Sequence, residues 1–182
     1  MKDAISILKS VGAIITDSHF VGTSGKHMSI YVNKDNLLPH TRETFEITKL
    51  LAEAHKDFNI DVVAAPVVGG VILGHLVAQH LSLLQKKEIL SVYAEKTAEG
   101  PMVFKRGYEN LIKNKKVLII DDTVATGFSV EKMLEVVRQF EGHIVGMGVV
   151  ANRVPKEINS KTLVIPFSWL CEIPAETYEE KD

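Results

Sequence analysis

Two adjacent carboxylates, followed by a turn of small residues, are the part of this sequence best suited to chemistry. Asp121 and Asp122 come directly after the apolar run 117–120, and a helical pattern begins a few residues later. Backbone N–H groups at the start of a helix, helped by the helix dipole, can hold a phosphate. Paired carboxylates can accept hydrogen bonds from sugar hydroxyls or hold a hydrated magnesium ion through water. The turn that would receive the phosphate is Thr123, Val124, Ala125, Thr126, Gly127, Phe128 and Ser129. The pattern therefore predicts a site for a phosphorylated sugar.

A basic stretch offers a second element suited to an anionic ligand. Residues 95–116 contain six basic and three acidic side chains, a local net charge of +3. Gly100, Pro101 and Gly107 favour a flexible loop within this stretch. A flexible cationic loop is typical of a lid over an anionic substrate. Residues 171–182 carry five acidic side chains and one lysine, a local net charge of −4, and we interpret them as solvated surface.

Several other phosphate- and metal-binding patterns do not fit. A P-loop needs a glycine, four residues and then Gly-Lys-Ser/Thr, but Gly25-Lys26 has Phe20 at the first glycine position and His27 after the lysine. A receiver domain needs a phosphoacceptor aspartate well after the pair, and 161–170 contain none. The seven histidines show no metal-ligand spacing. The single cysteine, Cys171, excludes a disulfide framework and a multi-cysteine zinc site.

The elements that must position these residues alternate between helices and strands. Strands are expected at 60–68, 89–93, 117–120, 144–150 and 163–167. Amphipathic helices are expected from Thr41, over 71–84 and after Gly127. This alternation predicts an α/β fold with a mainly parallel sheet flanked by helices. Ligands bind at the carboxyl ends of such strands, so the loops after the first and third strands should form the site.

Length and composition are those of a globular protein. The chain has 182 residues, of which 46% are hydrophobic and 24% charged, values that suit one domain and exclude a disordered chain. No apolar run approaches the roughly 18 residues of a membrane-spanning helix, and the N-terminus lacks the apolar core of a signal peptide. We therefore expect no membrane association and, with one cysteine, a cytoplasmic location. The net charge of −2 gives no indication of nucleic-acid binding.

The motif at 117–129 resembles the phosphoribosyl-diphosphate signature of the type I phosphoribosyltransferases. Within that family the chain is most similar to the orotate phosphoribosyltransferases, over about residues 12–178. Segment 23–31 is similar to their N-terminal hood segment, with Lys26 as its lysine. The other similar segments are the diphosphate-binding loop 65–70, the two sides of a short mobile catalytic loop, 93–96 and 104–107, and the strand 149–153 that ends in Arg153.

This resemblance implies a type I phosphoribosyltransferase fold with a small N-terminal hood. We expect one phosphoribosyltransferase domain over 1–182, with about 1–40 as the hood and about 41–170 as the core. The implied reaction transfers a 5-phosphoribosyl group from phosphoribosyl diphosphate to a base, above all to orotate, giving orotidine 5'-monophosphate and diphosphate. Magnesium is the implied cofactor, held through substrate and water without a direct protein ligand. A homodimer is also implied, because in this family the mobile loop commonly reaches the neighbouring active site.

The resemblance assigns roles to three groups of residues. The catalytic group is Lys96, Lys105, Arg106, Asp121 and Asp122, in which the cations close over the diphosphate and the aspartates fix the ribose hydroxyls. The phosphoribosyl-diphosphate-binding group is Val68, Gly69, Gly70, Asp121, Asp122, Thr123, Val124, Ala125, Thr126, Gly127, Phe128 and Ser129. The base-binding group is Lys26, Ala125 and Arg153, of which the arginine would pair bidentately with a carboxylate on the base.

Three departures from the orotate pattern keep other functions open. Ala125 stands where those enzymes usually have a threonine, and Ala125-Thr126-Gly127 is closer to the adenine-type enzymes. Phe128 replaces a small residue, and Asn152 replaces the usual acidic neighbour of the arginine. One alternative is therefore a phosphoribosyltransferase for another base, such as a purine. A second alternative is a non-catalytic regulator that binds phosphoribosyl diphosphate.

Overall fold

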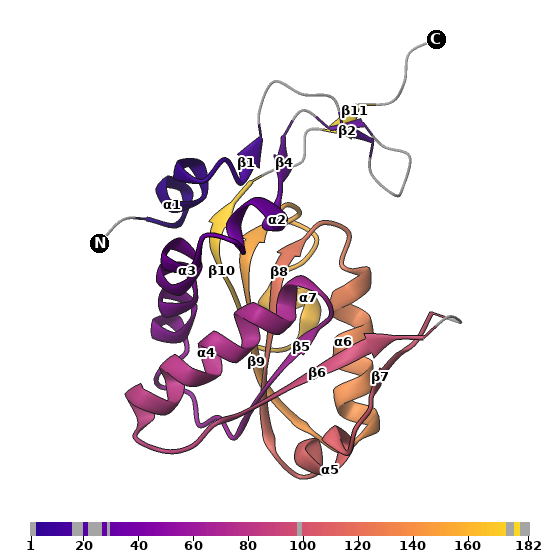
Figure 1. The fold of residues 1–182 in the computed structure, drawn as a ribbon. Helices are drawn as coiled ribbons and strands as arrows, with labels where there is room; N and C mark the ends of the chain where they lie inside the picture. The colour runs from indigo at the N-terminus through magenta and orange to yellow at the C-terminus, as the bar shows by residue number, and fades with distance from the viewer. Residues whose placement is uncertain are drawn as a thin grey trace.

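A six-stranded sheet forms the centre of the molecule (Figure 1). The computed structural model describes residues 3–15, 20–21, 27–28, 30–97, 100–173 and 177–178. The strand order is β10-β9-β8-β5-β6-β7, and neighbours are parallel except for β7, which is antiparallel to β6. The strands are β5 (Val62–Pro66), β6 (Leu90–Lys96), β7 (Met102–Phe104), β8 (Lys116–Val124), β9 (His143–Asn152) and β10 (Phe167–Glu172). The predicted mainly parallel α/β fold is confirmed.

Helices cover both faces of this sheet. On one face α1 (Ala4–Ser10), α3 (Thr41–Ala54) and α4 (Gly69–Gln85) contribute to one core cluster. On the other face α5 (Tyr108–Ile112) and α6 (Phe128–Gln139) contribute to a second cluster. Two short helices, α2 (Lys34–Leu37) and α7 (Ser160–Leu163), complete the described set. Among the described residues, no helix is both long enough and apolar enough to cross a membrane.

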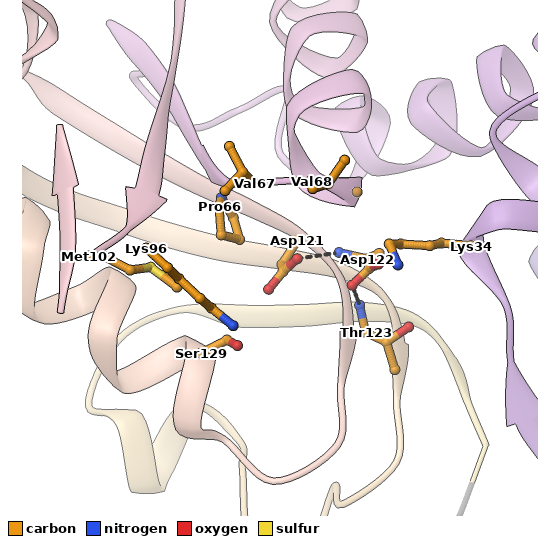
Figure 2. A pocket seen from close by; sticks show the side chains of 11 residues that line it. Lys34, Pro66, Val67, Val68, Lys96, Met102, Asp121, Asp122, Thr123 and Ser129 are labelled. Carbon is orange, nitrogen blue, oxygen red and sulfur yellow. Dashed lines mark hydrogen bonds between the residues drawn. The ribbon is translucent and has the colours of Figure 1, made fainter. Parts of the chain in front are cut away.

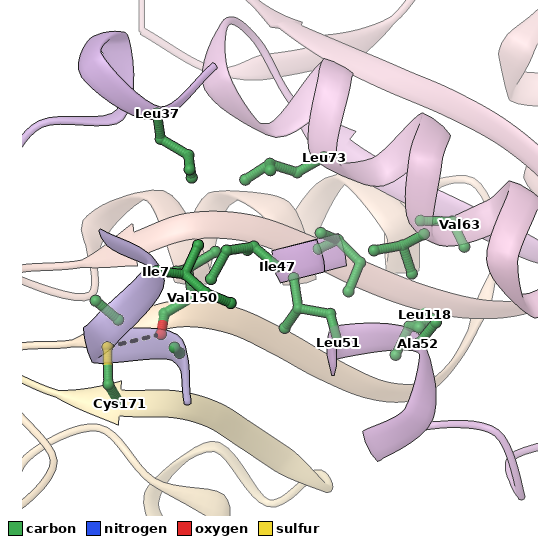
Figure 3. Close-up of a cluster of buried hydrophobic side chains, with 14 of the residues drawn as sticks. Ile7, Leu37, Ile47, Leu51, Ala52, Val63, Leu73, Leu118, Val150 and Cys171 are labelled. Atoms are coloured by element: carbon green, nitrogen blue, oxygen red, sulfur yellow. Dashed lines mark hydrogen bonds between the residues drawn. The ribbon is translucent and has the colours of Figure 1, made fainter. Parts of the chain in front are cut away.

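The central strands are buried on both faces, which explains their nearly continuous apolar runs. Val63 of β5 and Leu118 of β8 enter the first cluster, shown in Figure 3, whereas Val62 and Val117 enter the second. This division follows from the strand geometry, because successive side chains point to opposite faces. Polar residues can therefore enter β8 only toward its ends: Lys116 begins the strand, and Asp121 and Asp122 lie toward its carboxyl end.

The N-terminal segment, together with β11 (Thr177–Tyr178) near the C-terminus, forms two small antiparallel sheets. β1 (Ile14–Ile15) pairs with β4 (Tyr31–Val32), and β3 (His27–Met28) pairs with both β2 (Phe20–Val21) and β11. These strands, which with α2 we call the hood, lie beyond the ends of β8, β9 and β10 (Figure 1). Helix α1 belongs to the same N-terminal range but packs against α3 and β10 in the core.

One expected strand is wrong in detail, and two short elements were not predicted. The strand expected at 163–167 begins only at Phe167, because α7 comes first. Asn159 caps α7, accepting hydrogen bonds from the backbone N–H groups of Lys161 and Thr162. Within the basic stretch 95–116, β7 and α5 are elements that the sequence did not predict, and residues 98–99 of the expected loop lie outside the described residues. Both elements are too short to produce a clear periodic pattern.

Candidate active site

A cavity of about 230 Å³ opens at the carboxyl edge of the sheet, where β5 and β8 end and α4 begins (Figure 2). The two loops expected to form the site meet here, since parallel strands all end at the same edge. The residues that line the cavity are Lys34, Pro66, Val67, Val68, Gly69, Lys96, Met102, Asp121, Asp122, Thr123 and Ser129.

Asp121 and Asp122 lie in the middle of this lining. The backbone N–H of Asp122 donates a 2.8 Å hydrogen bond to Oδ1 of Asp121, and the N–H of Thr123 donates one of 2.6 Å to Oδ1 of Asp122. Burial raises the pKa of Asp121 well above its ordinary value, and the charge of Asp122 raises it further. Burial also raises the pKa of Asp122. The pair therefore keeps a proton to higher pH than free aspartates, and a bound cation or hydroxyl donor would favour its ionised form.

One lysine accompanies each aspartate. The positive charge of Lys96, at the end of β6, acts to lower the pKa of Asp121, and that of Lys34, on α2, acts to lower the pKa of Asp122. Figure 2 shows the two lysines on opposite sides of the aspartates. Two cations around two carboxylates suit a ligand that carries both phosphate groups and hydroxyls.

Two helices begin beside the cavity, and neither start is capped by a side chain. Helix α4 follows Val68 and α6 follows Gly127, and neither of these residues makes a side-chain cap hydrogen bond. The first N–H groups of a helix need an acceptor, which an anion can supply. Gly127 has a φ of +83°, and a Cβ there would lie 2.7 Å from Cδ1 of Ile158. The turn after the aspartates thus requires glycine and leaves N–H groups available for a phosphate.

The cavity brings together residues from three of the segments that the sequence singled out. These are Val68, Gly69, Lys96, Asp121, Asp122, Thr123 and Ser129. Gly70 is buried behind them in the first turn of α4, and Val124 is buried at the end of β8. Ala125 and Thr126 are exposed in the turn before α6. Phe128 is also exposed, and Nζ of Lys132 lies 4.0 Å from the centre of its ring. Lys26 lies outside the described residues.

Lys105 and Arg106 do not line the cavity. Nζ of Lys105 is 3.2 Å from Oε2 of Glu95, and Nη1 of Arg106 pairs closely with the other oxygen of the same carboxylate. The guanidinium of Arg106 also lies over the ring of Tyr93, 5.6 Å from its centre. Both cations are exposed. In this conformation Glu95 holds them beside the cavity rather than over it.

Arg153 lies at the end of β9, facing the hood rather than the cavity lining. It is buried, and its Nη2 donates a 3.0 Å hydrogen bond to the backbone carbonyl of Ile30. Its Nε is also buried and has no hydrogen-bond partner among the described residues. The neighbouring Asn152 holds the following loop, donating to the carbonyl of Ile158 and accepting from the N–H of Val154. Asn152 therefore has a structural role that an acidic residue could fill only in part, since a carboxylate cannot donate.

The sequence pattern missed three residues of this region. Lys34 and Met102 line the cavity, and Lys132 on α6 donates a hydrogen bond to the backbone carbonyl of Gly100, just before β7. Lys34 carries no local signal that distinguishes it from a surface lysine. Only the packing of α2 beside the start of α4 brings it to the aspartates.

The donor set fits a magnesium ion that is shared with a substrate. In the described part of the chain, no three His, Cys, Asp or Glu side chains gather into a cluster able to hold a metal ion. Asp121 and Asp122 supply two carboxylates in one cavity. Magnesium commonly binds through one or two carboxylates together with water and substrate phosphates.

The match to known proteins extends over most of the chain. Residues 33–169 match the model of the phosphoribosyl transferase domain. The orotate phosphoribosyltransferase of Caldanaerobacter subterraneus subsp. tengcongensis is 30% identical over 169 residues, which are 93% of this chain and 83% of that protein. The orotate phosphoribosyltransferase of Chlorobium phaeobacteroides is 33% identical over 169 residues, 92% of this chain and 81% of that protein.

The fold is likewise shared with solved structures. Orotate phosphoribosyltransferase from Mycobacterium tuberculosis, in complex with 5-phospho-alpha-D-ribosyl 1-diphosphate, superposes with a TM-score of 0.69 at 17% identity, covering 94% of this chain and 96% of that one. Because the family model spans the whole central sheet as far as β10 and the similar sequences extend over the hood, this protein belongs to the phosphoribosyl transferase family, alongside the orotate phosphoribosyltransferases.

Proposed function

We propose that this enzyme transfers the 5-phosphoribosyl group of phosphoribosyl diphosphate to a ring nitrogen of orotate, forming orotidine 5'-monophosphate and releasing diphosphate. The observation that carries the proposal is the pair of buried Asp121 and half-buried Asp122 between two helix starts without side-chain caps, with one lysine at each carboxylate. This arrangement suits a ribose with a phosphate at one end and a diphosphate at the other. The orotate relatives support the choice of base.

The start of α6 would hold the 5-phosphate through its backbone N–H groups, Ser129 and Thr126. Asp121 and Asp122 would accept hydrogen bonds from the ribose hydroxyls. The N–H groups of Gly69 and Gly70 would point at the diphosphate from the start of α4. Magnesium, when bound, would neutralise charge on the diphosphate as it leaves. The chain's own contribution is then positioning and electrostatic stabilisation, with no covalent nucleophile.

Lys96, Lys105 and Arg106 would close over the diphosphate once it is bound. Lys96 already lines the cavity, whereas Lys105 and Arg106 must first leave Glu95. A diphosphate carries more negative charge than one carboxylate and can draw the two cations away. Closure would also exclude water that otherwise hydrolyses the activated sugar.

Arg153 would bind the carboxylate of orotate. Its buried Nε lacks a partner among the described residues and its Nη2 is held by Ile30, so the guanidinium is oriented and still has donors. Substituting Arg153→Ala should raise the KM for orotate by about tenfold or more, because hydrogen bonds to charged groups contribute roughly 1.5–3 kcal/mol. The KM for phosphoribosyl diphosphate should change far less. Equal changes in both would contradict the assignment.

The function is tested by mixing the purified protein with magnesium, phosphoribosyl diphosphate and a panel of bases. We expect loss of the orotate absorbance, no turnover of adenine, and no activity after chelation of magnesium. Turnover of a purine in preference to orotate would identify another phosphoribosyltransferase, in line with Ala125. Binding of phosphoribosyl diphosphate without turnover of any base would identify a regulator.

We also propose that the enzyme is a cytoplasmic homodimer. Large apolar side chains are exposed on the outer faces of α3 and α4, among them Phe45, Ile72 and Leu83. An exposed apolar face of this kind is typical of a protein–protein interface. Sedimentation of the purified protein tests the dimer, and a monomer at micromolar concentration would contradict it. The location of a fluorescently labelled protein in its own cell tests the compartment.

A further inference from the structure

Lys34 brings a positive charge from the hood into the cavity. Its side chain lies against Gly69, the first residue of α4, because a Cβ built on Gly69 would come within 2.9 Å of Cε of Lys34 and 2.6 Å of Oδ2 of Asp122. The ammonium therefore lies where the helix start expected to hold the diphosphate meets the aspartate pair. Lys96 approaches the pair from the opposite side (Figure 2).

Helix α2, which carries Lys34, is tied to its surroundings on both sides. The side chain of Asn33 caps the helix, and the backbone N–H of Asn33 donates to the carbonyl of Ala13. The amide of Asn36 donates to the carbonyl of Gly12, and Oγ1 of Thr44 on α3 donates to the carbonyl of Leu37. Leu37 itself is buried in the first core cluster. These bonds fix the backbone of Lys34, so only its flexible side chain is free to change position when a ligand binds.

The ammonium of Lys34 has capacity for a ligand. Its ion pair with Asp35 is long, at 3.7 Å, and Asp35 is exposed with 75% of its side-chain surface accessible. Exposed pairs of this kind contribute little. The side chain of Lys34 itself is 31% accessible, so it is partly desolvated and would bind a phosphate more strongly than a lysine in open water.

We propose that Lys34 binds the diphosphate group of phosphoribosyl diphosphate, with its ammonium on the hood side of that group and Lys96 on the other. This inference rests on the proposed function, since it assumes that the diphosphate lies at the start of α4. Because the diphosphate gains charge as it leaves the ribose, the ammonium also stabilises the leaving group.

The test compares ligands with and without a diphosphate. Binding of inorganic diphosphate with magnesium, and of orotidine 5'-monophosphate, is measured by calorimetry on the wild type and on K34M, K34R and K87M. Lys87 is the matched control, because its ion pair with Asp61 is also 3.7 Å long and it follows the opposite end of α4. We expect K34M to weaken diphosphate binding by roughly 10- to 100-fold and to raise the KM for phosphoribosyl diphosphate in proportion. Binding of orotidine 5'-monophosphate should stay within about twofold of the wild type, K34R should restore most of the diphosphate affinity, and K87M should behave as wild type.

Three outcomes would overturn the inference. One is unchanged diphosphate binding in K34M, and another is an equal loss for both ligands, which would indicate a general structural role. The third is a loss of diphosphate affinity in K34M that disappears in alkaline buffer. Asp122 is ionised there with or without a neighbouring lysine, so this result would mean that Lys34 acts only by favouring the ionised form of Asp122. If the wild type itself fails to convert orotate, the proposed function fails instead, which is a separate result.

Discussion

At the scale of single residues, the cavity holds charged groups close together where they are partly shielded from water. Asp121 is buried beside Asp122, and both carry raised pKa values because burial disfavours their charged forms. The folded chain therefore holds two carboxylates in an environment that opposes their ionisation, until a ligand or metal compensates. Functional sites commonly hold groups in environments that lower the stability of the fold but favour binding of a ligand.

Substituting Asp121→Asn should abolish most of the activity and stabilise the fold. The amide keeps an oxygen for the N–H of Asp122 but removes the buried charge. We expect kcat/KM to fall by at least about tenfold and Tm at neutral pH to rise, by about 2–4 °C for each kcal/mol gained.

The pH dependence of this difference in Tm follows from linkage. The folded chain binds the proton of Asp121 more tightly than the unfolded chain does, so the free energy of unfolding of the wild type decreases as pH rises through the raised pKa. The difference should therefore grow with pH and vanish below the ordinary pKa of an aspartate. Wild-type activity should decline as pH falls through the same raised pKa. A D121N variant that is less stable than the wild type in alkaline buffer would contradict this account.

Substituting Glu95→Gln should release Lys105 and Arg106 toward the substrate. Both cations are exposed, so their pairs with Glu95 contribute at most about 1 kcal/mol. We expect the KM for phosphoribosyl diphosphate to fall by up to about fivefold at low ionic strength, and the effect to shrink with added salt. The control is E141Q, which removes a similar exposed pair with Lys113. A higher KM in E95Q would mean that Glu95 orients the cations for the ligand.

At the scale of elements, the site depends on where helices begin. Helices α4 and α6 both start at the carboxyl edge of the sheet without a side-chain cap, and each start is shaped by glycine. The short elements of the fold fix the segments around the site. Among the short elements, β7 and α5 give regular structure to two segments of the basic stretch, and Lys132 hydrogen-bonds to the carbonyl of Gly100, just before β7.

Substituting Gly127→Ala should disturb the start of α6 for two separable reasons. The φ of +83° is unfavourable for alanine, and the new Cβ would lie 2.7 Å from Cδ1 of Ile158. The matched control is G107A, because Gly107 has a φ of +84° but a Cβ there would meet no other atom within 4 Å. We expect G107A to lower Tm by about 2–8 °C for a backbone cost of about 1–2 kcal/mol. G127A should lower Tm further and weaken binding of phosphoribosyl diphosphate. Equal effects of the two variants on Tm would show that the Ile158 side chain moves away from the new Cβ without loss of stability.

At the scale of the whole molecule, we propose that residues 1–182 fold as one unit. The N-terminal residues belong to that unit because α1 packs in the core. Ile7 and Leu8 of α1 are buried in the same cluster as Leu51 of α3 and Cys171 of β10. Burial raises the pKa of the Cys171 thiol to about 11, and its Sγ lies 3.3 Å from the carbonyl of Val150. This thiol should be nearly inert while the chain is folded, because the thiolate is the reactive form.

The sole cysteine and the sole tryptophan can serve as two probes of whether the chain unfolds as one unit. Cys171 lies in the first core cluster, and Trp169 packs against the second. We expect modification of Cys171 by a thiol reagent and the fluorescence of Trp169 to report the same denaturant midpoint. Two separated midpoints would divide the chain into independently folding parts.

Local patterns in the chain were enough to predict the class of fold and the place of the candidate site. The alternation of apolar runs predicted the parallel sheet, which is confirmed, and Asp121-Asp122 with Gly127 predicted a phosphate-binding turn, because strand burial and helix starts depend on neighbouring residues. Short elements such as β7 and α7 could not be predicted in this way, because three or four residues are too few to show a helical or strand periodicity.

The tertiary structure alone decided which side chains meet in the cavity and around it. Lys34 reaches Asp122 only because α2 packs beside the start of α4, and Arg153 is oriented only because the hood presents the carbonyl of Ile30. Glu95 likewise engages Lys105 and Arg106 only because β7 folds back on β6. The contacts of Lys34 and Arg153 join segments far apart in the chain, and those of Glu95 require the pairing of β6 with β7, so no local spacing encodes them.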